Sequence, residues 1–338
     1  MKHIHRIRMM TIVVLAVVLL GSSYLASTTL AQDPHFTSID FPGAAVTVAN
    51  AVNVNGDIVG FYRLPNSTGG LQAPKGFILS NGVFTTITVP NASRTRVEGI
   101  NDNGDIVGDY LQSGVNYGFL RLAGTTSFQS IRYSNGTFQS PNTDSWGIDN
   151  DGNVTGGYTN SAGSTVAYIW RDGSFTRTFE AGFPNSGVAG AIVSYTHGIK
   201  PNGEIVGCYF VGTGNTAEMH GLHIMPDGTY VTEDFPGSFM MSMNWRISPS
   251  SIRVGHYVDM DGITHGYLAK NDDYETIDYP DAIATIAKGI AEIVIRNPKD
   301  KTLGSRQLLI VGQYVDSNNT THGYLFTRRL GVGKGEIQ

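Results

Sequence analysis

Short runs of aromatic and β-branched residues, separated by turn-forming residues, fill the chain after its first thirty residues. One stretch has runs at residues 95–101, 105–110, 117–122 and 128–133, with Gly, Asn, Asp or Pro between them. Such runs are typical of β-strands. The same pattern recurs at residues 144–149, 153–158, 166–171 and 175–180, and again at residues 194–200, 204–209, 220–225 and 230–235. Residues 282–295 come nearest to a helical pattern, but their β-branched content favours a strand. The chain is therefore predicted to be all-β.

One phrase returns six times: a pair of mostly apolar or β-branched residues, a glycine, any residue, and a tyrosine. Its glycines are residues 60, 108, 156, 207, 255 and 312, which lie 48, 48, 51, 48 and 57 positions apart. A fixed period of this size indicates one repeated supersecondary unit, and four strands in about 45–55 residues is the size of a propeller blade. We therefore predict a six-bladed β-propeller of four-stranded antiparallel blades. The glycine would allow a close backbone or ring approach. The tyrosine would wedge between sheets, the alternative being a ring of sugar-stacking tyrosines.

The two ends of the repeat array complement one another. Residues 321–326 match the third strand of a blade and no fourth follows, whereas residues 36–42 match a fourth strand that has no blade before it. We expect the N-terminal strand, residues 36–41, to pair with residues 322–327 of the C-terminal blade. This pairing would close the ring and remove exposed sheet edges.

Turn chemistry connects the first and second strands of four repeats. Asn55-Gly56, Asn103-Gly104, Asp151-Gly152 and Asn202-Gly203 are strong signals for tight hairpins, because both central positions need a positive φ. The sixth repeat instead carries an insertion at residues 296–307, which we expect to be a mobile excursion on the same face.

The first 31 residues are predicted to be a signal peptide. Lys2, Arg6 and Arg8 precede an apolar run at residues 9–20, and Thr29 and Ala31 supply small residues before the expected cleavage site. The apolar run is shorter than the ~20 residues of a membrane-spanning helix, although retention as an uncleaved anchor is the alternative. We therefore expect a secreted protein, extracellular or periplasmic, with no membrane span in the mature chain. Residues 32–329 would form one propeller domain and residues 330–338 a disordered tail.

Charge and cysteine content narrow the classes of partner. Without residues 1–31 the chain carries 20 Lys+Arg against 28 Asp+Glu, a formal charge of −8. Nucleic-acid binders need a basic face to displace counterions, so no nucleic-acid partner is expected. Cys208 is the only cysteine, so no intrachain disulfide can form.

Three histidines, His220, His265 and His322, open the third strand of consecutive repeats. Zinc needs its ligands within ~2.0–2.1 Å, whereas equivalent positions on different blades lie far apart. Separate hydrogen-bonding roles are therefore favoured over repeated ligand pockets and over a shared metal, and no metal site is predicted.

Two acidic turns, at residues 149–153 and 259–262, resemble calcium loops. They lack the glutamate that an EF-hand has at its twelfth position. They are therefore interpreted as hairpin turns, with occasional Ca²⁺ binding as the alternative, and no cofactor is predicted.

The run from Gly99 to Gly108 reads GINDNGDIVG, and the triplets His265-Gly266-Tyr267 and His322-Gly323-Tyr324 recur later in the chain. In these motifs the repeats resemble the bacterial extracellular repeat family named for its His-Ala-Phe (HAF) motif. Glycine replaces the alanine of the family motif throughout. The resemblance implies secretion and a repeat β-fold. It carries no reaction to transfer, so no catalytic residue is inherited.

Function follows less directly from the sequence than the fold does. The chain has no Gly-x-Ser-x-Gly elbow, no His-Glu-x-x-His and no phosphate-binding loop. The second-to-third and fourth-to-first loops are long and carry Phe183, Phe239 and Met240. We expect a binding or scaffold module, not an enzyme, that recognises extracellular polysaccharide or a secreted or cell-surface protein through this long-loop face. Candidate binding residues are these three and the three histidines. The alternatives are a carbohydrate-active hydrolase or lyase with carboxylates at the channel mouth, and a purely structural protein.

Overall fold

The computed structural model describes residues 34–179, 192–212, 217–296 and 304–330, which all belong to one compact unit. They form strands, turns and loops, with no helix among them, so the all-β prediction is confirmed. Within these residues no helical segment has the length and hydrophobicity required to cross a lipid bilayer. The predicted signal peptide, residues 331–338 and Phe183 lie outside the described residues.

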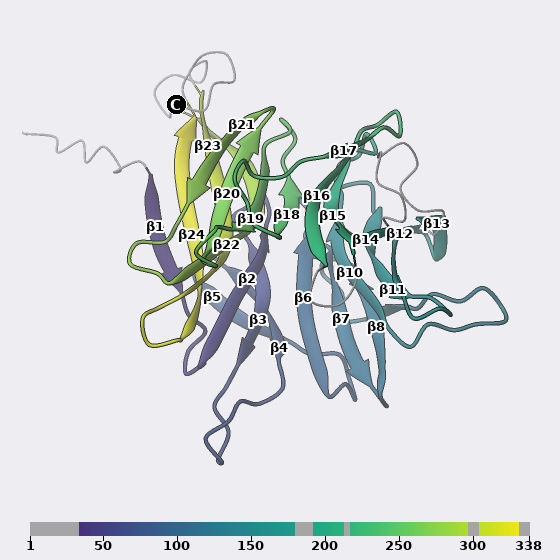
Figure 1. Cartoon of the computed structure of the whole chain (residues 1–338). Helices are drawn as coiled ribbons and strands as arrows, with labels where there is room; N and C mark the ends of the chain where they lie inside the picture. Colours follow the sequence, from purple (N-terminus) through teal and green to yellow (C-terminus); the bar gives the residue numbers. More distant parts are fainter. Residues whose placement is uncertain (1–33, 180–191, 213–216, 297–303, 331–338) are drawn as a thin grey trace, which may run out of the picture. The chain divides into compact units, whose positions relative to one another are not determined.

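The fold is a propeller of four-stranded antiparallel blades (Figure 1). Four sheets stand separately. The first contains β6 (Arg94–Ile100), β7 (Ile106–Gln112), β8 (Val115–Arg121) and β9 (Gln129–Ile131). The second contains β10 (Thr143–Ile148), β11 (Val154–Thr159), β12 (Thr165–Arg171) and β13 (Ser174–Thr178). The third contains β14 (Ile192–Ile199), β15 (Ile205–Val211), β16 (Glu218–Ile224) and β17 (Tyr230–Thr232). The fourth contains β18 (Ser242–Ile247), β19 (Arg253–Val258), β20 (Thr264–Lys270) and β21 (Asp273–Ile277).

The first and last repeats share one eight-stranded sheet. It joins β2 (Val46–Val52), β3 (Ile58–Arg63), β4 (Lys75–Ser80) and β5 (Val83–Ile87) to β22 (Ala284–Arg296), β23 (Gly304–Val315), β24 (Thr321–Leu330) and β1 (His35–Ile39). Six separate four-stranded sheets were predicted, and the structure differs because a single parallel bridge, Val46 to Thr321, connects these two groups of strands.

The predicted pairing of the chain ends is present. β1 runs antiparallel to β24, with Ser38 opposite Tyr324 and Ile39 opposite Gly323 (Figure 1). β24 extends to Leu330, one residue into the predicted tail.

The predicted excursion at residues 296–307 is shorter in the structure, because strands β22 and β23 extend into both of its ends. β22 and β23 pair out to Arg296 and Gly304, so both ends of this segment are strand. Residues 297–303 lie outside the described residues.

The repeated glycine and tyrosine both pack as expected. A Cβ added to Gly60 would lie 1.9 Å from the carbonyl oxygen of Val48, so only glycine fits the strand crossing. In four repeats the tyrosine ring stacks on an aromatic ring that precedes the repeat, as in Phe235–Tyr257 with ring centroids 3.7 Å apart. Tyr110 instead stacks on Tyr117 of its own sheet. The Tyr257 hydroxyl is hydrogen-bonded to Thr276 on the fourth strand of its own sheet, at 2.9 Å. The tyrosine is thus a wedge between sheets.

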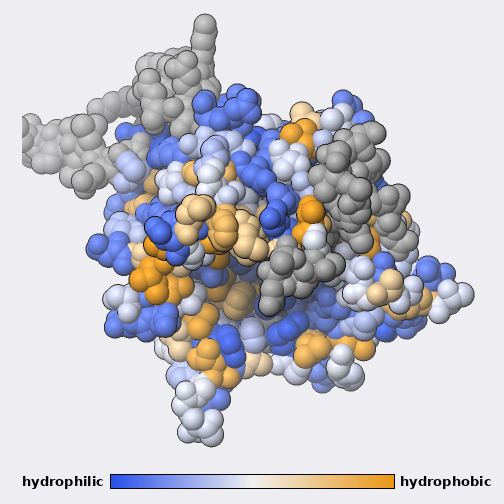
Figure 2. Space-filling view, in the orientation of Figure 1, coloured by the Kyte–Doolittle hydropathy of each residue, from blue (hydrophilic) through white to orange (hydrophobic). Residues whose placement is uncertain are grey.

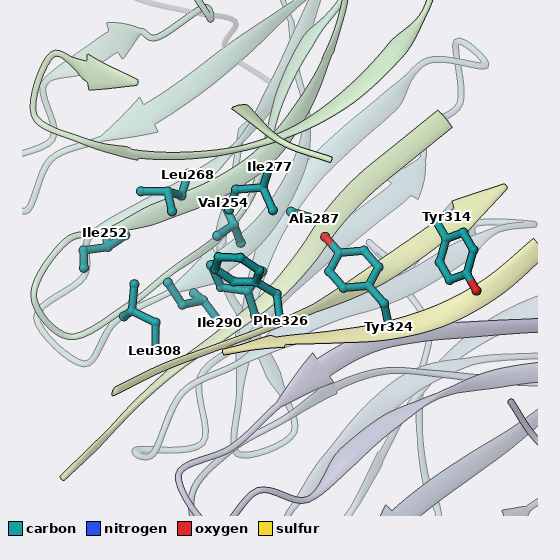
Figure 3. Close-up of a cluster of buried hydrophobic side chains, with 11 residues drawn as sticks. Ile252, Val254, Leu268, Ile277, Ala287, Ile290, Leu308, Tyr314, Tyr324 and Phe326 are labelled. Carbon is teal, nitrogen blue, oxygen red and sulfur yellow. The ribbon is translucent and has the colours of Figure 1, made fainter. Parts of the chain in front are cut away.

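The hydrophobic core lies between neighbouring sheets. In one cluster, Val254 and Leu268 of the β18–β21 sheet face Ile290, Tyr324 and Phe326 of the next group of strands (Figure 3). On the surface drawn in Figure 2, hydrophobic side chains occur in small groups among hydrophilic ones.

Each first strand carries a β-bulge at the same point of the repeat. The bulge residues are Asn50, Glu98, Trp146, His197, Trp245 and Lys288. The first strands contact one another in the cyclic order β2, β6, β10, β14, β18, β22 and back to β2. The bulges therefore bring six backbone segments together around a common centre.

Candidate functional site

Arg246 occupies the centre of these first strands. It follows the bulge of β18, and in the five other repeats the equivalent residue is small: Ala51, Gly99, Gly147, Gly198 and Gly289. Because these five residues have little or no side chain, they leave a central space. The Arg246 side chain enters that space.

The Arg246 guanidinium is hydrogen-bonded to backbone carbonyls of four repeats. Nη1 donates to the carbonyl oxygens of His197 at 2.7 Å and Trp245 at 2.9 Å. Nη2 donates to the carbonyl oxygens of Glu98 at 2.6 Å and Trp146. Burial lowers the pKa of Arg246 to about 10, against the opposing field of Glu98, so the guanidinium stays charged at neutral pH.

A cavity of about 510 Å³ opens on one side of Arg246. Its wall next to Arg246 is a ring of six branched apolar residues from the six repeats: Val52, Ile100, Ile148, Ile199, Ile247 and Ile290. Farther out, the lining includes Val54, Asp102, Asn150, Pro201, Pro249 and Glu292, which we call the rim. This volume is within the ~300–1,000 Å³ range of small-molecule sites.

Repeated turn chemistry builds the rim of the first three repeats. The Asn101 side chain accepts a hydrogen bond from the backbone N–H of Asp105 and donates to the carbonyl oxygen of Asp149, 48 residues onward. The Asp102 carboxylate accepts hydrogen bonds from the backbone N–H of Val54 at 3.1 Å and from Nδ2 of Asn150 at 2.8 Å. Each turn is therefore fixed to the next at the repeat period.

In the later repeats, ion-paired side chains connect each turn to the next. Lys200 pairs with Glu204 and donates to Oγ of Ser251 at 2.9 Å. Glu292 pairs with Arg306 and accepts a hydrogen bond from the backbone N–H of Ser250 at 3.0 Å. These side chains connect the fourth repeat to the fifth and the fifth to the sixth.

The bulge side chains do not belong to the cavity lining. Three of them form an aromatic group, with the His197 ring centroid 4.3 Å from Trp245 and 4.9 Å from Trp146. Lys288 donates from Nζ to Oδ1 of Asn50 at 3.1 Å, and Nζ lies 4.5 Å from the Trp245 ring centroid. Arg246 therefore separates these side chains from the cavity.

Burial shapes the charges behind Arg246. It lowers the pKa of Lys288 to about 8 and lowers the pKa of His197 well below its usual value, an effect to which Arg246 and Lys288 add. It raises the pKa of Glu98, although Arg96 and Lys288 oppose that shift. The centre of the first strands is thus a region of positive charge.

The three predicted histidines have separate partners. Nδ1 of His220, His265 and His322 lies 2.8, 2.7 and 2.8 Å from a carboxylate oxygen of Asp234, Asp278 and Asp40, respectively. Each ring also stacks on the repeated tyrosine of its sheet, at Tyr209, Tyr257 and Tyr314. Burial alone would lower the pKa of His265, but hydrogen bonds with Asp278 and Asp259 raise it above its ordinary value.

The other predicted binding residues lie on the turn between β17 and β18. Phe239 and Met240 are 45% and 39% exposed, and the Met240 carbonyl accepts a hydrogen bond from the backbone N–H of Met219, next to His220. His265 and His322 lie on other sheets. The cavity is at the opposite end of the strands, where the first strand turns into the second.

The acidic turns use their oxygens internally. Oδ1 of Asp149 accepts hydrogen bonds from the backbone N–H groups of Asp151 and Asn153, and Asp259 does the same for Asp261 and Ile263. In the part of the chain that the structure describes, no group of three His, Cys, Asp or Glu residues is arranged to hold a metal ion.

Sequence reasoning missed the cavity and Arg246. One signal was available, because an aligned set of repeats shows arginine in the fifth where the others have glycine or alanine. The size of the space that the five small residues leave could not be predicted from the sequence, because it depends on how the six first strands are arranged around Arg246.

Three solved structures similar to this chain have low sequence identity to it. A triple-mutant form of AofleA from Arthrobotrys oligospora has a TM-score of 0.47 at 12% identity, with 89% of this chain and 91% of that chain covered. A putative gluconolactonase has a TM-score of 0.47 at 10% identity, with 88% and 94% covered. The β-propeller domain of the Trilobed protease from Pyrococcus furiosus has a TM-score of 0.43 at 10% identity, with 91% and 95% covered. No protein-family model matches the chain, and no curated protein matches it either.

Proposed function

We propose that this chain is an exported, closed six-bladed propeller that binds a small ligand in the cavity beside Arg246. The observation that carries the proposal is the cavity itself, about 510 Å³, lined by equivalent residues of all six repeats with Arg246 at its base. The six-blade count is supported by the cyclic contacts of the first strands and by the single bridge that joins the two halves of the eight-stranded sheet.

Binding is favoured over hydrolysis because two of the three carboxylates that line the cavity are engaged, Asp149 by its own turn and Glu292 by Arg306 and Ser250, which leaves only Asp102 among them without a buried turn or a cationic partner. Two further carboxylates, outside the lining, are engaged as well. Asp109 is held by Arg94 and Arg96, at 3.0 and 2.8 Å. Asp144 accepts hydrogen bonds from Asn116 and Asn142, at 2.6 and 3.0 Å. Burial and the neighbouring Asp109 raise the pKa of Asp144 to about 6. A glycosidase uses a pair of carboxylates that flank the scissile bond. The cavity lining, as described, also contains no aromatic side chain on which a sugar could stack.

The remaining predictions fit this function. The predicted signal peptide and the resemblance to the HAF repeat family favour an extracellular or periplasmic location. A polysaccharide or protein partner would present only a chain end to a cavity of this size. The histidines and Phe239–Met240 on the other face would then serve a second contact or the packing of the blades.

A ligand screen with a blocking variant tests the proposal. Residues 32–338 would be screened by thermal shift against sugars, amino acids, short peptides and organic acids. Pro201→Trp places a large ring at the rim, where Pro201 is exposed, and should abolish the shifts that wild type shows. Thr85→Trp, on the exposed outer strand β5, should keep them. The proposal fails if no compound shifts wild type, or if Pro201→Trp responds as wild type does.

A further inference from the structure

Three charges that line the cavity, Arg246, Asp102 and Asp149, form no ion pair among the described residues. Asp149 is buried, and its carboxylate accepts hydrogen bonds from Asp151 and Asn153 of its own turn, so Arg246 and Asp102 are the two charges left for a ligand. Among the described residues, no carboxylate forms an ion pair with Arg246, whose Nη1 and Nη2 groups donate to backbone carbonyls. At the rim, the carboxylate of Asp102 accepts hydrogen bonds from two neutral donors, the Val54 N–H and the Asn150 amide, and forms no ion pair with another described residue. Lys200 and Glu292, by contrast, are matched by Glu204 and Arg306. The cavity is thus positive at its base and negative at its rim.

The separation of these charges follows from strand geometry. Gly289 lies level with Arg246 in the repeat and Glu292 lies level with Asp102, and both line the cavity from β22. Three residues at ~3.3 Å per residue place the rim about 10 Å from the base. Between them lies the ring of six Val and Ile residues, which carry no charge. Asp149 and Lys200 also line this part, and their charged groups are engaged by the Asp149 turn and by Glu204.

We propose that the ligand is a short peptide with both ends free, bound with its carboxylate toward Arg246 and its ammonium toward Asp102. This inference rests on the proposed function, because it specifies what the same cavity binds. An extended chain covers ~3.3–3.6 Å per residue, so three residues span the distance between the two charges. A free amino acid is too short to reach both charges, and a longer peptide leaves one end outside.

The peptide can use only those groups of the cavity that are not already hydrogen-bonded within the protein. The in-plane Nη N–H groups of Arg246 are used by carbonyls, so the peptide carboxylate would lie over the guanidinium face. The attraction there would be between the two opposite charges, without a hydrogen bond from the Nη groups. The apolar ring would take small aliphatic side chains.

A length and end-blocking series provides the test. Alanine and its di-, tri-, tetra- and pentapeptides would be titrated into residues 32–338, with calorimetry and tryptophan fluorescence as readouts. Two of the three tryptophans, Trp146 and Trp245, give their carbonyls to Arg246. Trialanine should bind tightest. Acetylating its amine or amidating its carboxylate should each weaken binding at least 10-fold.

The variant Asp102→Asn tests whether the amino terminus of the peptide lies next to Asp102. Asp102→Asn keeps the side-chain shape and should weaken trialanine about 5-fold while leaving N-acetyl-trialanine unchanged. Asp227→Asn removes the same charge from an exposed turn outside the cavity lining and should change neither.

The outcomes separate this inference from the proposed function. The peptide inference is wrong if trialanine with both ends blocked binds as tightly as free trialanine. It is also wrong if no peptide binds while Pro201→Trp abolishes the binding of other compounds. In both cases the cavity remains a binding site. If no compound of any class depends on the cavity, both are wrong.

Discussion

Nη2 of Arg246 donates a hydrogen bond to the carbonyl oxygen of Glu98, 148 residues earlier in the chain, at 2.6 Å. The bond joins the fifth repeat to the second across the centre of the first strands. The bulges turn the carbonyl groups of Glu98, Trp146, His197 and Trp245 away from the hydrogen bonds between strands. Arg246 donates to all four, so these repeats need no separate hydrogen-bond donors at this point.

Replacing Arg246 with alanine should destabilise the fold strongly. Four carbonyls lose a charged donor, and hydrogen bonds to charged groups contribute ~1.5–3 kcal/mol each. We expect the free energy of unfolding to fall by at least ~3 kcal/mol, after water has replaced some of the lost bonds. Urea denaturation followed by circular dichroism measures this. Arg171→Ala, at an exposed side chain that pairs only with Asp172 among the described residues, is the control and should change little. A loss as small as that of the control would contradict a central role for Arg246.

The closing strand β1 can be tested through one buried residue. Ile39 is 7% exposed and packs in a cluster with Ala49, Phe77 and Val311, which come from both groups of strands in the eight-stranded sheet. Ile39→Ala should cost ~2–4 kcal/mol, because a cavity forms where the strand seals the sheet. Thr37→Ala, at an exposed side chain of the same strand, should stay within ~0.5 kcal/mol. Equal effects of the two substitutions on the melting temperature would mean that β1 does not seal the ring.

Glycine at the repeated phrase should not tolerate even one methyl group. A Cβ at Gly255 would lie 1.9 Å from the carbonyl oxygen of Met243 and 2.7 Å from the Tyr267 ring. Overpacking usually costs ~1–3 kcal/mol, and contact with a backbone atom places Gly255→Ala at the upper end or beyond. At Gly70 a Cβ would lie 3.0 Å from Nδ2 of Asn66 and meet no backbone atom among its nearest neighbours, so Gly70→Ala should cost clearly less than Gly255→Ala. Chemical denaturation of the two variants makes the comparison, and a near-neutral Gly255→Ala would refute the packing argument.

The strand pattern was readable from sequence because each strand depends on local signals. Turn residues and β-branched runs predicted residues 105–110, and the structure has β7 at Ile106–Gln112. The pairing of β1 with β24 was also predictable, because an unmatched fourth strand and a missing one imply each other. The eight-stranded sheet was not predictable, since it depends on one bridge between Val46 and Thr321.

The candidate site was harder to predict because it depends on what is absent from five repeats. Gly147 and its equivalents give no distinct signal within their own strands, because their effect appears only when all six first strands meet around Arg246. The three histidines drew attention because they repeat. In the structure each has its own aspartate and tyrosine, so repetition marked a packing unit.

Acid should destabilise the protein through His256. Nε1 of Trp245 donates to Nδ1 of His256 at 2.9 Å, which requires that nitrogen to be unprotonated. Burial, with a contribution from Lys288, lowers the pKa of His256 to about 4. The unfolded chain, with a histidine pKa of ~6.5, binds this proton first. Stability is therefore complete above about pH 6.5 and falls as the pH drops toward 4, by up to ~3 kcal/mol. His256→Gln, which keeps an acceptor for Trp245 but does not titrate in this range, should lose less stability between pH 7 and pH 4 than wild type. Denaturation curves at pH 7 and pH 4 give the loss of stability of each protein. Subtracting the loss of His256→Gln from that of wild type removes the contribution of the carboxylates, which both proteins share. Parallel losses in the two proteins would show that His256 is protonated in the folded state without cost.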